Sequence, residues 1–189
     1  MSDDPYLIPG TGTLRNKFGI TDPDELDDAE RVLVRERLME GRVPTGAFDL
    51  AHLQAIHRYL FQDVYDWAGE VRTVEMSKEK SVFQLRAYIG TGMADIHRRL
   101  VESDFLRGLT RRKFAAEAAR IIGDVNYVHP FREGNGRTQA LYLEQLAEKA
   151  GHPIDLGKLT RETWIPASQA AINAEYAPMA RCIERALIR

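Results

Sequence analysis

Apolar residues recur every three or four positions along most of the chain, which is the spacing of amphipathic helices. The first such stretch follows Asp22, a capping residue, and Pro23, which suits a first helical turn. It stops at Gly41, so we predict a helix of roughly four to five turns. A second apolar stripe begins after Asp49 and continues toward Gly69. It predicts one amphipathic helix between these two residues.

The spacing changes between residues 71 and 85, where apolar and polar positions alternate around a charged centre at residues 78–80. Alternation with period two is typical of a strand exposed on one face. The pattern therefore predicts a small exposed β-hairpin at about residues 73–84.

Helical spacing returns in the rest of the chain. One helix is predicted over residues 89–100, and the next runs from the expected cap Thr110 to Val125. A further helix ends at Gly151, and two closing helices are expected to be broken by Pro166 and Pro178. The expected fold class is mainly α, a compact helical bundle with one hairpin.

Composition narrows the class of protein. With 189 residues, 44% of them hydrophobic, the chain can bury the core of a single domain. Its 26 basic and 28 acidic residues provide no overall field for nucleic acid, so we expect no direct nucleic-acid binding. The sequence shows neither a secretory leader nor a long apolar span, and Cys182 is its single cysteine. We expect a cytoplasmic protein without membrane insertion, and delivery into another cell stays open.

The stretch VHPFREGNGRTQAL, residues 128–141, carries the candidate chemistry. A loop that opens a helix suits an anion, because the first amides of a helix lack intrahelical partners. Gly134 and Gly136 would let the backbone turn around a phosphate. Asn135 could hold the loop or donate to a phosphate, and Arg137 could grip a second phosphate with its guanidinium.

Three other residues complete this site. Glu133 could hold a divalent cation between phosphates, and His129, at the end of the preceding helix, could act as a general base near neutral pH. Phe131 is expected to anchor the loop in the core. A lone histidine or Gly-x-Gly is usually structural, but the combination within nine residues favours a polyphosphate site beside a base.

This stretch resembles the motif of the Fic (filamentation induced by cAMP) family, His-x-Phe-x-(Asp/Glu)-Gly-Asn-Gly-Arg-x-x-Arg. Seven positions match, namely His129, Phe131, Glu133, Gly134, Asn135, Gly136 and Arg137. The stretch HLQAIHRYLFQDVYDWAGEVRTV is similar to the family's helix before its hairpin, and MSKEKSVF to the hairpin called the flap. The N-terminal DPYLIPGTGTLRNKFGI looks like bacterial Fic toxins and the Fic domains of type IV secretion effectors.

The resemblance implies transfer of AMP from ATP to a Ser, Thr or Tyr hydroxyl of a target protein, with pyrophosphate leaving. His129 would deprotonate the target hydroxyl, and Glu133 would ligate Mg²⁺. The loop Gly134–Gly136 would cradle phosphate oxygens, with contacts from Asn135 and Arg137. ATP is then the co-substrate and Mg²⁺ the cofactor.

The resemblance also implies how the chain is divided. Residues 1–189 form a single Fic domain, with an arm and helix at 1–45, the core at 46–151 and closing helices at 152–189. The flap would hold an extended target segment by main-chain hydrogen bonds, as an exposed strand can. Its candidate docking residues are Thr73, Val74, Glu75, Met76, Ser77, Lys78, Val82 and Phe83.

The sequence departs from the family at Ala140, where the motif has a second arginine. One alternative is therefore a weakened Fic-fold module that binds nucleotide or a partner, and another is transfer of a different phosphate-containing group, as in the Doc-type kinases. Family inhibitory helices carry Ser/Thr-x-x-x-Glu-(Gly/Asn), but Glu36 precedes Glu40 and Gly41 here. The resemblance then implies an inhibitory helix supplied by a separate small antitoxin.

Two weaker patterns are also present. Ser77-x-x-Lys80 matches the Ser-x-x-Lys of penicillin-binding enzymes, but no companion motif accompanies it. His52 and His57 are five positions apart on a predicted helix, so they would not share a face for a metal ion. We expect these two histidines to be ordinary packing or surface residues.

Overall fold

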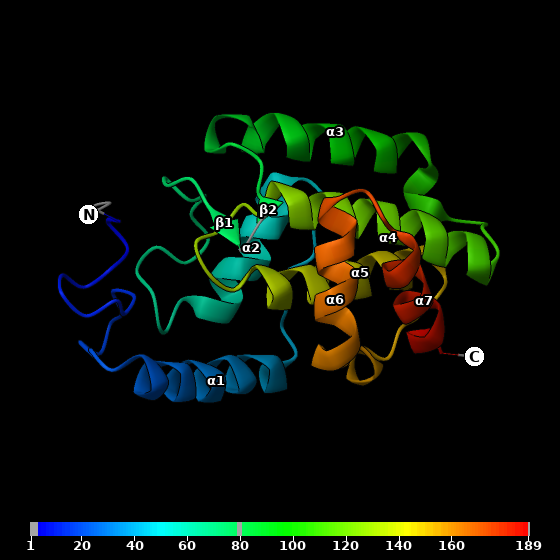
Figure 1. Ribbon diagram of the computed structural model, residues 1–189. Helices are drawn as coiled ribbons and strands as arrows, with labels where there is room; N and C mark the ends of the chain where they lie inside the picture. Colours follow the sequence, from blue (N-terminus) through cyan, green and yellow to red (C-terminus); the bar gives the residue numbers. More distant parts are fainter. Residues whose placement is uncertain (1–3, 79–80, 189) are drawn as a thin grey trace.

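The computed structural model of the protein describes residues 4–78 and 81–188 (Figure 1). Within these residues the chain forms seven α-helices and one two-stranded hairpin. The helices are α1 (Pro23–Glu40), α2 (Leu50–Phe61), α3 (Ile89–Glu102), α4 (Arg111–Val128), α5 (Asn135–Ala150), α6 (Arg161–Ile172) and α7 (Ala177–Ala186). The strands are β1 (Ser77–Lys78) and β2 (Ser81–Val82), and single 3-10 turns lie at Arg86–Tyr88, Asp104–Leu106 and Leu156–Lys158. The predicted mainly α class is confirmed.

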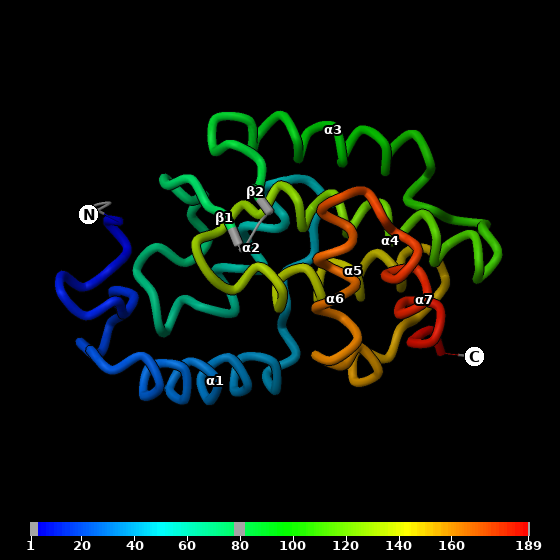
Figure 2. The backbone as a smooth tube through the Cα atoms, in the orientation of Figure 1, coloured from blue at the N-terminus to red at the C-terminus, as the bar shows by residue number. Residues whose placement is uncertain are grey.

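Helix α4 is the central element of the fold. It packs against α3, α5, α6 and α7, while α2 packs against α1 and α5. Helices α1 and α3 lie along opposite edges of the molecule, and the N-terminal arm and the C-terminus lie at opposite ends (Figures 1 and 2). Among the described residues, no helix is both long enough and apolar enough to cross a membrane.

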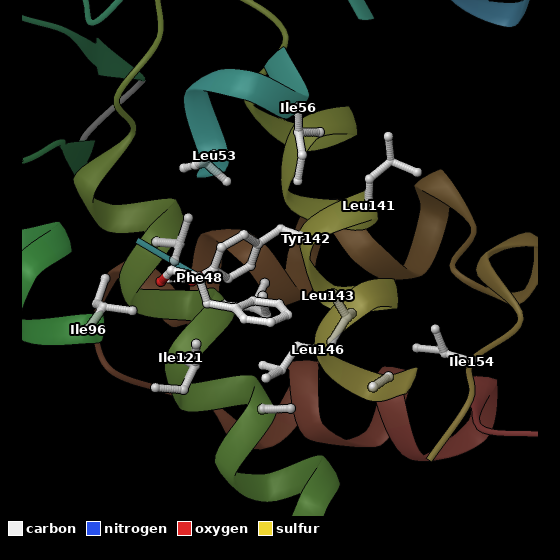
Figure 3. Close-up of a cluster of buried hydrophobic side chains, with 14 of the residues drawn as sticks. Phe48, Leu53, Ile56, Ile96, Ile121, Leu141, Tyr142, Leu143, Leu146 and Ile154 are labelled. Carbon is white, nitrogen blue, oxygen red and sulfur yellow. Dashed lines mark hydrogen bonds between the residues drawn. The ribbon is translucent and has the colours of Figure 1, made fainter. Parts of the chain in front are cut away.

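A continuous apolar core fixes α2, α4 and α5 relative to one another (Figure 3). Tyr142 of α5 is fully buried, and its hydroxyl donates to the carbonyl of Phe48, 2.8 Å away. Leu53 of α2 and Ile121 of α4 belong to the same cluster. Because such interiors are close-packed, the C-terminal end of α4 and the N-terminal end of α5 are held by a rigid support.

The predicted start and end of α1 are confirmed. The Asp22 carboxylate accepts from the amides of Asp24 and Glu25, and Gly41 caps the other end with φ of 63°. Helix α2, however, ends at Phe61 and not near Gly69. The apolar spacing misled the prediction because the turn after the helix keeps Val64 fully buried.

The hairpin is confirmed but is shorter than predicted. Ser77 pairs with Val82 in antiparallel register, and the residues 79 and 80 expected at its charged tip lie outside the described residues. Helix α4 begins after Thr110 as expected, although the Thr110 side chain makes no capping hydrogen bond.

The expected break at Pro166 is wrong. Pro166 lies within α6, in its second turn, where a missing amide removes a single hydrogen bond and the rest of the helix continues. Pro178 instead lies in the first turn of α7, where a proline costs nothing because that amide has no intrahelical acceptor.

Candidate active site

The motif forms the connection between α4 and α5. His129 follows the last residue of α4 in a left-handed conformation, with φ of 47°, and its amide donates to the carbonyl of Val125. Asn135 closes the loop, since its side chain accepts from the Phe131 amide (3.0 Å) and donates to the Phe131 carbonyl (2.7 Å). Phe131 is fully buried and stacks on the ring of His57 at 4.0 Å, as expected of an anchor.

The hydrogen bonds of His129 define which ring nitrogen can accept a proton. Its Nδ1 lies 3.2 Å from the carbonyl oxygen of Asn126. A carbonyl only accepts, so Nδ1 carries the hydrogen in this bond and Nε2 carries the lone pair. The ring also stacks on Phe83, with centroids 3.7 Å apart. The imidazole is thus oriented for general-base chemistry at Nε2.

Arg72 joins the hairpin to the end of α4. Its guanidinium is buried and donates to the carbonyls of His129 (2.8 Å), Val74 (2.6 Å) and Gln84 (2.5 Å). The planar fork of donors suits several acceptors held in fixed positions. The backbone on both sides of the hairpin, at Val74 and Gln84, is thereby tied to the backbone of the candidate base.

The N-terminus of α5 offers unpaired donors. Thr138 is the first residue of this helix whose amide has an intrahelical-type acceptor, the carbonyl of Gly134. The described residues provide no acceptor for the amides of Asn135, Gly136 and Arg137, and no side chain caps the helix. A helix end of this kind attracts an anion through its free amides and the helix dipole.

The two glycines of the loop differ in geometry. Gly134 has φ of 79°, and a Cβ there would approach the Phe61 ring to 2.4 Å. Gly136 has no positive φ, and a Cβ there would meet nothing within 4 Å. Gly136 borders the same cavity as His129, so its missing side chain leaves open space at the helix end.

A cavity of about 400 Å³ lies between the motif, the hairpin and α6. On the motif side it is bordered by His129, Glu133 and Gly136. The α6 wall combines apolar and polar side chains, namely Trp164, Ile165, Ser168, Gln169 and Ile172. The hairpin wall consists of Met76, Ser77 and Phe83. The cavity therefore has a helix end and a base at one side and a mixed apolar wall at another.

Glu133 fits the role of a cation ligand. Its carboxylate is half exposed and lines the cavity, and one oxygen accepts from the Gly134 amide at 2.9 Å. Groups of three or more His, Cys, Asp or Glu side chains that could hold a metal are absent from the described residues. A single carboxylate of this kind suits Mg²⁺ only when phosphate oxygens and water complete the shell.

Arg137 lies in the first turn of α5, and its side chain is directed toward α1. Its guanidinium contacts Glu30 of α1 at 2.5 Å and lies over the Phe61 ring, and it does not border the cavity that contains His129. Glu30 is buried and also accepts from the hydroxyl of Tyr65. Arg137 thus forms an ion pair with a buried carboxylate, and its contact with a phosphate stays a prediction.

The flap residues have unequal surroundings. Thr73 donates its amide to the hydroxyl of Tyr6, and Glu75 accepts from the Arg86 amide. Val82 is exposed, whereas Phe83 is buried beneath the hairpin. Docking of a target segment on the flap stays a prediction. Phe83 has the additional role of orienting the His129 ring, on which it stacks.

The two histidines of α2 are packing residues, as expected. His57 accepts from the Gly69 amide at Nδ1, so its Nε2 donates to the Glu133 carbonyl, 2.9 Å away. Burial lowers the pKa of His57 from 6.5 to about 4. Burial likewise lowers the pKa of His52, whose Nδ1 accepts from the Phe48 amide.

Sequence reasoning missed the contributions of Arg72, His57 and the α6 wall. Arg72 alternates in step with the apolar residues Val74 and Met76, and His57 falls on the apolar stripe with Leu53, so both carried a signal for burial. The α6 wall carried none, because it comes from a helix distant in sequence.

Comparison with known proteins agrees with this geometry. Residues 47–147 match the Fic/DOC family. The probable protein adenylyltransferase y4lH of Sinorhizobium fredii is 38% identical over 97% of this chain and 95% of its own length. The protein adenylyltransferase VbhT of Bartonella schoenbuchensis is 39% identical over 93% of this chain, which spans 36% of VbhT.

Solved structures show the same fold. BepC of Bartonella tribocorum, a VirB-translocated effector solved with bound AMPPNP, has a TM-score of 0.89 and 29% identity, over 98% of this chain and 97% of BepC. An N-terminal Fic domain of Bartonella quintana with bound ADP also has a TM-score of 0.89, with 31% identity over 97% of this chain and 94% of that domain. The motif, the site and these likenesses together show that the chain belongs to the Fic/DOC family.

Proposed function

We propose that this protein is a protein adenylyltransferase that transfers AMP from ATP to a hydroxyl side chain of a target protein. The observation that carries the proposal is the uncapped N-terminus of α5 beside the oriented ring of His129, within one cavity. The likeness to y4lH over nearly the full length of both proteins supports it.

The residues define the steps of the reaction. His129 takes the proton of the target hydroxyl at Nε2, and the hydroxyl oxygen then bonds to the α-phosphorus as the bond to pyrophosphate breaks. The free amides at the start of α5 stabilise the charge on the phosphate oxygens. Glu133 would hold Mg²⁺, which supplies further charge neutralisation when bound.

The cavity suggests how the nucleotide lies. Its phosphates fit the motif end, at Gly136, where there is space and a row of donors. The base and sugar fit the wall of α6, where Trp164 and Ile165 offer apolar surface and Gln169 offers an amide. The bound AMPPNP of BepC and ADP of its relative support a nucleotide of this class.

The hairpin supports binding of a protein target. Both of its strands are edges, because β1 pairs only with β2 among the described residues. Such an edge can pair with an extended segment and bring its hydroxyl near His129. The hairpin borders the same cavity through Met76 and Ser77.

The proposal also covers how the enzyme is inhibited and where it acts. We infer a separate small antitoxin protein, because Glu36 stands where the family's inhibitory helix has Ser or Thr. We also infer a cytoplasmic site of action, either in the producing cell or in a cell that receives the protein, as the likeness to the translocated BepC suggests.

The test is incubation with labelled ATP, Mg²⁺ and a bacterial lysate. We expect labelled target bands with the parent protein and none with His129→Ala, while His97→Ala on α3 serves as a histidine control outside the cavity. Mass spectrometry should find an added AMP on the target. An added phosphate would favour a Doc-type kinase, and absence of label with the parent would favour a binding module.

A further inference from the structure

The catalytic cavity is lined by a positively charged side chain that has no role in the proposed reaction steps. Among the described residues that line this cavity, Arg132 is the only lysine or arginine. It stands in the loop between His129 and Glu133, directly before the expected cation ligand. Its side chain is about one-fifth exposed, so the guanidinium is largely shielded from water.

The other candidate cations of the motif are directed elsewhere or missing. Arg137 is paired with the buried carboxylate of Glu30 and borders a different cavity. Position 140, one turn beyond Gly136 on α5, is an alanine and offers no charge. A polyphosphate in the catalytic cavity would therefore meet Arg132 as its guanidinium partner.

Arg132 is held in place by the N-terminal arm. Its Nε and Nη2 atoms each lie 3.0 Å from one carboxylate oxygen of Asp4. The other oxygen of Asp4 accepts from the Tyr6 amide, and the Tyr6 hydroxyl contacts Thr73 at the root of the hairpin. The described residues provide no acceptor for Nη1 of Arg132, so one edge of the guanidinium stays available.

We propose that Arg132 binds the terminal phosphates of the nucleotide through this available edge, and that Asp4 is the residue that positions it. The inference rests on the proposed function and names a phosphate-binding residue for the same cavity. Position supports the phosphate end, because Arg132 adjoins Glu133 in the loop, whereas the base has its apolar wall on α6. A guanidinium can bind two phosphate oxygens at once.

The test is calorimetric binding of AMPPNP, ADP and AMP, each with Mg²⁺, to the parent and its variants. We expect Arg132→Gln to weaken AMPPNP binding by about tenfold or more and AMP binding far less, because the lost charge-assisted contact is to the terminal phosphates. Arg132→Lys should recover part of the loss. Asp4→Asn should lower the preference for AMPPNP over AMP by less than Arg132→Gln does, since it loosens the position of the cation without removing the charge.

Arg37→Gln is the matched control. Arg37 also pairs through Nε and Nη2 with one carboxylate, that of Asp63, and lies on α1 outside the cavity. It should leave the binding of all three nucleotides unchanged. Unfolding curves of each variant test for loss of fold. If Arg132→Gln does not fold, Arg132→Lys replaces it in the test. A lower preference of Arg132→Lys for AMPPNP over AMP than in the parent then supports the proposal, and an unchanged preference contradicts it.

The outcomes separate the two proposals. If the parent binds AMPPNP but Arg132→Gln weakens all three nucleotides equally, Arg132 has only a structural role and this inference is wrong. If the parent binds none of the three nucleotides, the proposed function fails together with it.

Discussion

At the scale of single residues, two glycines of one loop have separate requirements. Gly134 needs a positive φ and lies against the face of Phe61, so its role is to let the chain enter α5. Gly136 is an ordinary helical residue with open space in front of it, so its role is to leave room. A sequence motif that contains both therefore combines a folding requirement with a binding requirement.

Alanine substitution should separate these two requirements. Gly134→Ala should lower the free energy of unfolding by about 1 to 3 kcal/mol, because the backbone is strained and the methyl group overlaps the Phe61 ring. Gly136→Ala should leave that free energy unchanged or raise it by up to about 1 kcal/mol, since alanine favours a helix. It should nevertheless weaken ATP binding, because the methyl group enters the anion site.

Urea unfolding and ATP titration of both variants measure the two effects. Equal stability losses at the two positions would contradict the distinction between them. So would ATP binding by Gly136→Ala as tight as that of the parent.

At the scale of elements, a single side chain couples the hairpin to α4. Arg72 is buried, and its three nitrogens reach carbonyls on both sides of the hairpin and at the end of α4. A buried guanidinium needs acceptors, and these carbonyls supply them. The flap and the candidate base therefore hold their relative positions through one guanidinium.

Replacing Arg72 with lysine should loosen this coupling. A compact ammonium cannot reach three fixed acceptors as a planar fork does, so we expect a loss of about 2 to 3 kcal/mol in unfolding free energy. Hydrogen exchange should rise in the backbone on both sides of the hairpin. Arg86→Lys, at an exposed residue that pairs loosely with Glu75, should change the unfolding free energy by less than about 0.5 kcal/mol. Equal effects of the two substitutions would refute the coupling.

Local patterns predicted the elements well where one face of a helix determines burial. Asp22 and Gly41 marked the ends of α1, because their capping roles depend on neighbours in sequence. The apolar spacing extends α2 too far, because Val64 stays buried in the turn after the helix and continues the pattern. Pro166 predicts a break that is absent from α6, because a helix supported by packing tolerates one lost hydrogen bond.

The candidate site was predictable only in part for the same physical reason. His129, Glu133 and the two glycines are neighbours in sequence, so the motif placed them in one loop. The partner of Arg137 was not predictable, because Glu30 comes from a helix more than a hundred residues earlier. Contacts of this kind depend on tertiary packing, which single-sequence periodicity does not contain.

At the scale of the whole molecule, His57 connects the fold to the motif. It is a fully buried residue of α2 that contacts the turn at Gly69 and the motif loop. Its Nε2 donates to the Glu133 carbonyl, and its ring stacks on Phe131. Its neutral form satisfies both hydrogen bonds, one as acceptor and one as donor. A second proton would turn the accepting nitrogen into a donor that faces the Gly69 amide.

Acid should therefore destabilise the whole fold through this residue. Burial lowers the pKa of His57 from 6.5 in the unfolded chain to about 4 in the folded protein, so between these values the unfolded chain binds a proton that the folded chain does not. Stability is then fully present above about pH 6.5 and falls as the pH approaches 4, by up to about 3 kcal/mol. Urea unfolding at several pH values should show this slope in the parent and a flatter one in His57→Gln, which cannot take up the proton. The remaining slope belongs partly to His52, whose pKa burial also lowers, and parallel curves for parent and variant would show that His57 is not the responsible group.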